Sequence, residues 1–235
     1  MCKPAIGKPA KRNAHEPSLA LRESVECAPM RKLVILLLAL LVAPAWAQHA
    51  PLFEAVAAGR LEQVVQLIGA GATVNARNND GETPLYAAAE AGHGAVVSFL
   101  LGKGADVNIP TKNGETVLHA AALTGDAALI TLLLDRGAEP DRANRDGERP
   151  LFWAALAGMG RAAQLLLERG ADVNAVDAQG NSALHGAVDA GHETIAWLLL
   201  DQGAKRALRN SAGDTALDIA RRRDHGEIVK LLQSR

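Results

Sequence analysis

The chain has 235 residues, with 25 Lys and Arg against 26 Asp and Glu, and only two cysteines, Cys2 and Cys27. Beyond residue 47 no cysteine remains, and the net charge is −5, because residues 1–47 hold seven of the basic and three of the acidic side chains. This composition excludes a disulfide framework and disfavours nucleic-acid binding, which needs a basic surface.

The first 47 residues differ from the rest. A short basic start at residues 30–32 is followed by an apolar run over 33–43, and residues 45–47 read Ala-Trp-Ala, an A-x-A cleavage signal. This order is typical of a secretory signal peptide, so we expect a signal over 30–47 and a periplasmic or secreted mature protein. The apolar run of about 11 residues is short of the roughly 20 that a membrane-spanning helix needs, so we expect no stable anchor after cleavage.

Residues 1–29 precede this signal, whereas a signal peptide normally begins at the initiator methionine. Our hypothesis is that translation starts at Met30 and that residues 1–29 are not native. The alternative is a disordered cytoplasmic extension on an anchored protein.

From residue 50 onward the sequence repeats every 33 residues. Three glycine series keep this step: Gly59, Gly92, Gly125, Gly158 and Gly191; Gly71, Gly104, Gly137, Gly170 and Gly203; and Gly81, Gly114, Gly147, Gly180 and Gly213. A period in this range is the signature of a repeat architecture, in which each unit is stabilised by its neighbours. We place repeats at about 50–78, 79–111, 112–144, 145–177, 178–210 and 211–235, all within one domain, 48–235.

The second repeat shows how one unit is built. A turn at Gly81 leads to Thr83, which can cap a helix, and Pro84 suits the first helical turn. Gly92 ends this helix, and a second apolar helix follows as far as Gly104.

The succession of a turn glycine, T-P-L-Y-A-A-A, G-H, L-L and G-A-D-V-N resembles the ankyrin repeat. The resemblance covers roughly residues 50–235. It implies an all-α solenoid of stacked helix-turn-helix units with β-turn or hairpin tips, and a role in binding other proteins.

The residue expected to cap each first helix changes together with the residue three positions later. The cap series is Ala50, Thr83, Thr116, Arg149, Ser182 and Thr215, and its partners are Phe53, Tyr86, His119, Phe152, His185 and Asp218. Thr and His interact at these positions in ankyrin repeats, which implies structural roles for His119 and His185. We expect structural roles also for His93, His192 and His225, which open second helices.

No catalytic motif stands out from the repeat. The serines lie outside nucleophile motifs, turns account for the glycines, and the histidine spacing does not match a zinc-binding helix. We therefore expect no enzyme activity, no cofactor and no metal.

Ankyrin-like proteins hold partners on the tips and on the exposed face of the first helices. Candidate partner-binding residues are those at such positions that the repeat does not require. They are Asn79, Asp80, Glu82, Tyr86, Glu90, Lys112, Asn113, Glu115, Leu123, Arg145, Asp146, Glu148, Trp153, Leu156, Gln179, Asn181 and Asp189.

Two tryptophans depart from the repeat. Trp153 stands where other repeats have Ala87, Ala120 and Gly186, so it either contacts a partner or fills space left by the altered cap. Trp197 is expected on the outer face of its second helix.

The expected function is non-catalytic binding of another protein in the periplasm of a Gram-negative bacterium. The alternatives are a secreted effector or immunity-type protein and a structural homo-oligomer. Exported ankyrin proteins are sometimes linked to support of a partner enzyme in the envelope, and that idea rests on the resemblance alone.

Overall fold

The computed structural model describes residues 45–234, and residues 1–44 and 235 lie outside the description. The expected extension over 1–29 and most of the signal peptide, 30–44, are therefore not tested. Within residues 45–234, no helix is long and apolar enough to cross a bilayer.

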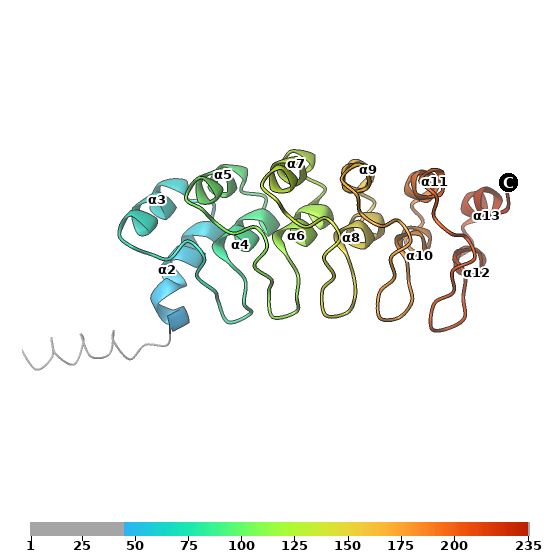
Figure 1. Ribbon diagram of the computed structural model, residues 1–235, viewed down its shortest axis with the longest axis horizontal. Helices are drawn as coiled ribbons and strands as arrows, with labels where there is room; N and C mark the ends of the chain where they lie inside the picture. Colours follow the sequence, from blue (N-terminus) through green and yellow to red (C-terminus); the bar gives the residue numbers. More distant parts are fainter. Residues whose placement is uncertain (1–44, 235) are drawn as a thin grey trace, which may run out of the picture. The chain divides into compact units, whose positions relative to one another are not determined.

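The described residues form pairs of antiparallel helices stacked side by side (Figure 1). The first helices are α2 (Ala45–Ala57), α4 (Pro84–Glu90), α6 (Val117–Thr124), α8 (Pro150–Leu156), α10 (Ala183–Asp189) and α12 (Ala216–Arg222). The second helices, in the upper row of Figure 1, are α3 (Leu61–Gly69), α5 (Gly94–Gly102), α7 (Ala127–Asp135), α9 (Gly160–Glu168), α11 (Glu193–Asp201) and α13 (Gly226–Gln233). The predicted all-α solenoid is confirmed, and an isolated bridge between Val176 and Ser182 is the β pairing recorded in residues 45–234.

The core runs through the stack as a line of equivalent leucines, one from each first helix. Leu52, Leu85, Leu118, Leu151 and Leu184 are all buried, whereas Leu217 in the last repeat is only partly buried. Alanines beside them, such as Ala88 and Ala121, are fully buried and let neighbouring helices approach closely. Burying one leucine contributes roughly 1.5–3 kcal/mol, so stability accumulates from repeat to repeat.

The three glycine series share one backbone feature. All fifteen have a positive φ, and the single non-glycine residue with a positive φ in the described chain is Asp224, at 58°. Asp224 lies 33 residues after Gly191, so it holds the glycine position of the last repeat. A side chain at Gly191 would meet the His225 ring at 3.0 Å, whereas Asp224 is exposed within residues 45–234.

The predicted interaction between cap and histidine is confirmed in two repeats. The backbone N–H of Thr116 donates to His119 Nδ1 at 3.0 Å, and that of Ser182 donates to His185 Nδ1 at 3.1 Å. Because Nδ1 accepts, the proton of His119 is on Nε2, which donates to the carbonyl of Glu148 in the next repeat at 3.3 Å. The histidine therefore caps its own helix and joins two repeats.

Histidines that open second helices also bridge repeats. His93 Nε2 lies 2.9 Å from the carbonyl oxygen of Ala57, and His192 Nε2 lies 3.1 Å from that of Leu156. The equivalent His225 Nε2 is buried and makes no hydrogen bond within the described residues, although its ring packs on Gly191.

One expectation about the caps was wrong. Ala50 does not cap the first helix, because α2 begins at Ala45 and runs through it. Alanine has no side-chain oxygen with which to stop a helix, and the residues before it are compatible with one. Thr83 caps α4, as expected. Thr83 Oγ1 accepts from the backbone N–H of Tyr86 at 3.1 Å, and the phenol donates to Glu115 in the next repeat at 3.4 Å.

We expect Asp224→Gly to raise the free energy of unfolding by about 0.5–1 kcal/mol, because glycine adopts a positive φ without steric cost. Urea unfolding followed by circular dichroism would measure the change. The matched control, Gly191→Asp, should be destabilising, because φ is 79° there and the His225 ring occupies the space. A destabilised Asp224→Gly protein would contradict this account.

Burial lowers the pKa of His119 to about 4, with a smaller opposing effect from the Glu148 carbonyl. The folded protein then binds fewer protons than the unfolded one between pH 4 and 6.5, so stability is full above about pH 6.5 and is lost as the pH falls. When the pH is lowered from 7.5 to 5, this histidine alone should lower the free energy of unfolding by about 2 kcal/mol. Burial lowers the pKa of His185 too, which adds a loss of the same sign.

Urea unfolding at the two pH values would test this, with His119→Gln as the control that removes the titrating group. A loss of stability that is as large in His119→Gln as in the native protein would show that His119 does not carry the effect.

Candidate binding surface

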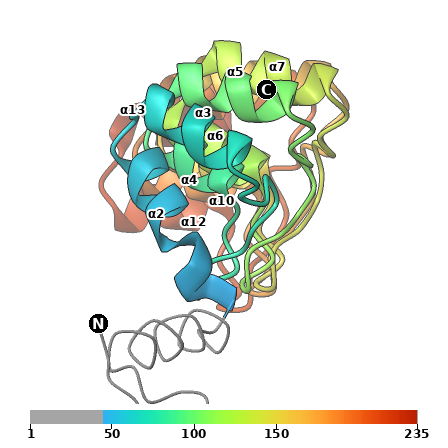
Figure 2. The ribbon, with the colours of Figure 1, turned by 90° about the vertical axis from the view of Figure 1, so that its left-hand side faces the viewer.

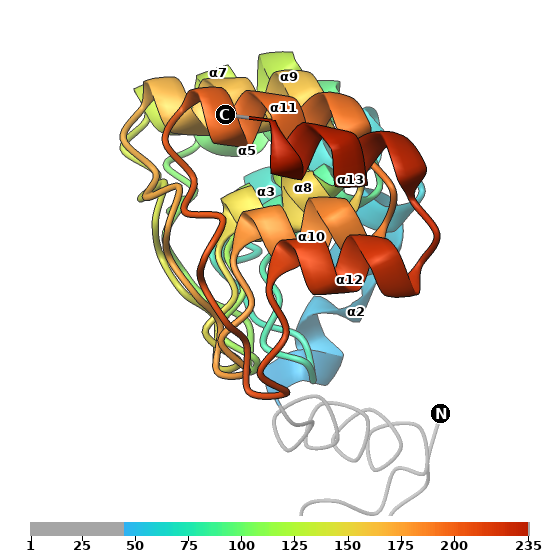
Figure 3. The ribbon, with the colours of Figure 1, turned by 90° about the vertical axis from the view of Figure 1, so that its right-hand side faces the viewer.

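The tips and the first helices together form the inner face of the stack. Seen from either end, the tips descend from the helix layer and meet the first helices at an angle (Figure 2, Figure 3). We define the inner face as the tips 79–82, 112–115, 145–148, 178–181 and 211–214 and the first-helix positions 90, 123, 156, 189 and 222.

Each tip is closed by the residue at its base. Asn144 shows the arrangement: its Oδ1 accepts from the backbone N–H of Asp146 at 3.0 Å and from that of Glu148 at 2.9 Å. Asn78, Thr111, Asp177 and Asn210 do the same in their repeats. These five base residues were not among the predicted candidates, although a side-chain oxygen at every 33rd position indicates them.

Neighbouring tips are joined by their backbones. The N–H of Lys112 donates to the carbonyl of Asp80 at 2.8 Å, and that of Arg145 donates to Asn113 at 2.7 Å. Equivalent bonds join the tips at Ala178 and Ser211 to the tips before them. The tips therefore form a continuous row in which the side chains project from a fixed backbone.

The candidate residues fall into three groups by exposure. Those exposed on the inner face are Asn79, Asp80, Glu90, Lys112, Asn113, Leu123, Arg145, Asp146, Leu156 and Gln179. Those half-buried are Glu82, Glu115, Glu148, Trp153, Asn181 and Asp189. Tyr86 is only 5% exposed and offers a partner little contact area. Whether any of them binds a partner stays a prediction.

Most of the half-buried polar candidates have contacts within the scaffold. The carboxylates of Glu82 and Glu148 accept from the base asparagines Asn78 and Asn144 at 2.6 and 2.9 Å. Glu115 accepts from Thr111 at 3.1 Å. Because these three carboxylates help to close the tips, their hydrogen bonds within the tips are enough to account for glutamate at these positions.

Asn181 and Asp189 also have partners further along the stack: Asn210, at the base of the next tip, and Arg223 in the next repeat. Asn181 Oδ1 accepts from Asn210 at 3.0 Å. The carboxylate of Asp189 accepts hydrogen bonds from Nε and Nη2 of Arg223, at 2.8 and 2.9 Å. Both side chains therefore contribute to the joining of repeats.

The N-terminal half of the inner face is acidic. Glu82, Glu90 and Glu115 surround Tyr86, whose pKa is raised first by burial and then by these carboxylates. The pKa of Glu90 is raised by partial burial and by the other two carboxylates. The three carboxylates thus form a negative region beside α4 and α6 to which a cation would be attracted.

Trp153 has a defined place in the scaffold. Its Nε1 donates to Glu148 at 2.8 Å, and its ring meets the His119 ring edge-on, with 5.4 Å between centroids. These contacts give the ring a packing role, and only a part of it remains exposed.

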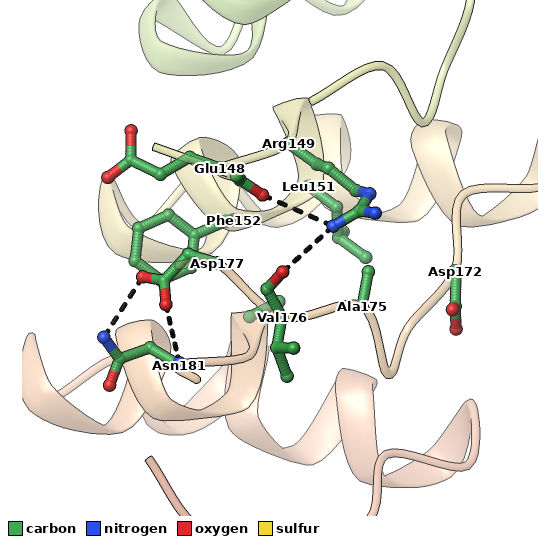
Figure 4. A pocket seen from close by; sticks show the side chains of 11 residues that line it. Glu148, Arg149, Leu151, Phe152, Asp172, Ala175, Val176, Asp177 and Asn181 are labelled. Carbon is green, nitrogen blue, oxygen red and sulfur yellow. Dashed lines mark hydrogen bonds between the residues drawn. The ribbon is translucent and has the colours of Figure 1, made fainter. Parts of the chain in front are cut away.

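Arg149, which replaces the capping hydroxyl, joins repeats three and four, because its Nε donates to the carbonyl of Asp141 at 3.2 Å and lies 3.4 Å from the carboxylate of the same residue. Its Nη1 donates to the carbonyl of Gly147 at 3.3 Å and to that of Val176 at 3.1 Å (Figure 4). The cavity around it, about 10 Å³, has room for about one water molecule.

Phe152 leans towards Gly186, where a Cβ atom would lie 3.1 Å from its ring. Phe152, rather than Trp153, therefore uses the space that the missing side chain at Gly186 leaves.

The centre of the inner face is apolar. Leu123 and Leu156 are 45% and 44% exposed, at a position that Glu90, Asp189 and Arg222 hold in other repeats. With Trp153 they make up what we call the central patch. On its C-terminal side a hollow of about 230 Å³ opens between α8, α10 and α12, with Phe152, Leu156 and Ile219 among its lining residues.

The described residues contain no group of three or more His, Cys, Asp or Glu side chains placed to hold a metal ion. The surface therefore consists of a polar row of tips, an acidic end and an apolar centre.

A family model described as "Ankyrin repeats (3 copies)" matches the chain in four overlapping segments, 52–144, 95–177, 124–209 and 151–235. No curated protein matches the chain. Ankyrin repeats are generally protein–protein interaction modules. The matched segments span nearly all of the described stack, and the chain belongs to the ankyrin repeat family.

Proposed function

We propose that this protein binds another protein through its inner face, with the central patch as the main contact, and that it does so without catalysis after export to the periplasm. The observation that carries the proposal is the exposure of Leu123 and Leu156 where other repeats have charged side chains. Nothing in the scaffold requires leucine at these two positions.

The central patch has the composition of an interface core. Aromatic and large apolar side chains at the middle of a contact carry most of its energy, and polar residues around them exclude water. Trp153 is held by His119 and Glu148, so little side-chain freedom would be lost on binding.

The charges beside the patch favour a partner with a basic group next to an apolar segment. Such a segment would cover Leu123 and Leu156, and its basic group would lie over Glu90 and Glu115. The tips, tied to one another by backbone hydrogen bonds, supply the polar rim.

The double substitution Leu123→Asp with Leu156→Asp should weaken partner binding by about 10- to 100-fold, because it places two charges in the apolar centre. The partner would be recovered from periplasmic extract with the native protein, purified, and titrated by calorimetry. Val65→Asp is the matched control, since Val65 is equally exposed on α3 in the other row of helices. Undiminished affinity in the double variant would refute the role of the patch.

Sedimentation of the native protein separates this proposal from a structural homo-oligomer. A dimer that the double variant abolishes would show that the patch joins copies of this chain, and the proposal would then be wrong. Trp153→Ala is less suitable as a first test, because loss of its contacts with His119 and Glu148 should also lower the melting temperature.

Export is tested with residues 30–50 fused to a reporter that is active only in the periplasm. We expect activity and a mature N-terminus at Gln48. Leu36→Arg with Leu37→Arg should abolish both, because it interrupts the apolar run. Retention of the fusion in the cytoplasm would remove the proposed location without affecting the binding proposal. Mutation of the Met30 codon tests the start site, and an unchanged full-length product would count against it.

A further inference from the structure

The row of second helices carries one side chain that the repeat does not account for. Trp197 on α11 is 55% exposed, more than any other large apolar side chain in residues 50–234. The equivalent residues are Val65, Ser98, Thr131, Gln164 and Lys230. Smaller or polar side chains suffice at this position, so packing does not explain a tryptophan.

Trp197 lies at a hollow between α9 and α11. The volume is about 350 Å³, and besides two leucines the lining consists of Gln164, Glu168, Asp201 and Gln202. No lysine or arginine of residues 50–234 lines it, and none lies over the Trp197 ring. An exposed aromatic face with carboxylates and amide oxygens beside it has the chemistry of a cation site.

Comparison with the preceding pair of repeats shows which group is missing. Between α7 and α9, Arg169 donates to the carboxylate of Asp135 at 3.0 Å. Thirty-three residues later the acid is kept as Glu168, but the arginine is replaced by Gln202. The junction between α9 and α11 therefore has the carboxylate without the guanidinium that its neighbour supplies.

The contacts of Glu168 within the chain are weak substitutes for that guanidinium. Its carboxylate accepts from the Gln164 amide at 2.9 Å and lies 4.0 Å from Arg161, in a pair whose side chains are both at least half exposed. Such a solvated pair contributes little to stability. Glu168 and Asp201 are also the last residues of α9 and α11, where the helix dipole disfavours negative charge. A bound cation would pair with the Glu168 carboxylate. It would also offset the unfavourable interaction of Glu168 and Asp201 with the dipoles of their helices.

We propose that this hollow binds the guanidinium group of an arginine on a second protein, stacked on Trp197 and paired with Glu168. A guanidinium is planar and can stack on an indole while it donates to a carboxylate at its edge. The acidic lining excludes the phosphate backbone of a nucleic acid, and the volume exceeds that of a single metal ion. Because this site is on the row of second helices, it is separate from the central patch.

Nuclear magnetic resonance of the ¹⁵N-labelled mature protein, from Gln48 onward, tests the proposal through the indole N–H signals of Trp153 and Trp197, assigned with Trp197→Phe. The probe is the capped tripeptide Gly-Arg-Gly, and its matched control has citrulline in place of arginine, which keeps the shape and removes the charge. We expect the Trp197 signal to shift saturably with the arginine peptide, and the citrulline peptide to bind about threefold more weakly or worse. The Trp153 signal should not move.

Three variants complete the test. Glu168→Gln should weaken the response by about threefold or more. Gln202→Arg should abolish it, because that arginine restores the pair seen between Asp135 and Arg169 and occupies the hollow. Glu193→Gln removes a carboxylate from the same helix outside the hollow and should leave the response unchanged. Equal shifts with both peptides, or a response that survives Gln202→Arg, would overturn the proposal.

Discussion

The structure depends on one constraint: a pair of short helices cannot bury its apolar side by itself. Each leucine in the series from Leu52 to Leu184 is buried because a neighbouring repeat covers it, and Leu217, in the last repeat that the structure describes, is only partly buried. Burial is thus a property of the contact between units. The same contact places the first helices side by side, which is why residues 33 positions apart form one face.

Polar interactions follow the same geometry. His119 caps its own helix with one ring nitrogen and reaches the next repeat with the other, so local and long-range structure depend on a single neutral imidazole. Arg149 joins repeats three and four by another chemical route, from its guanidinium to the carbonyl and the carboxylate of Asp141. The stack therefore accommodates different side chains at the cap position, each of which contacts a neighbouring repeat.

Much of this could be predicted from sequence because a 33-residue period carries local and neighbour information together. The helix pairs and the turns at the repeated glycines followed from it. The structural roles of His119 and His185 followed from the resemblance to ankyrin repeats. The bond from Tyr86 to Glu115 could not be predicted, because it joins residues 29 positions apart and depends on side-chain direction. The start of α2 was also missed, since Ala50 lacks the capping oxygen that marks a boundary.

For the candidate surface, the register indicated which side of the molecule each residue occupies but not that Glu82, Glu115 and Glu148 help to close the tips.

The bonds between successive tips join peptide groups only, as in the pair formed by Lys112 and Asp80. Replacement of either side chain leaves both bonding atoms in place. The side chains at the tips can therefore be substituted one at a time in evolution without loss of the backbone hydrogen bonds that join the tips. A scaffold with that property separates what it recognises from how it folds.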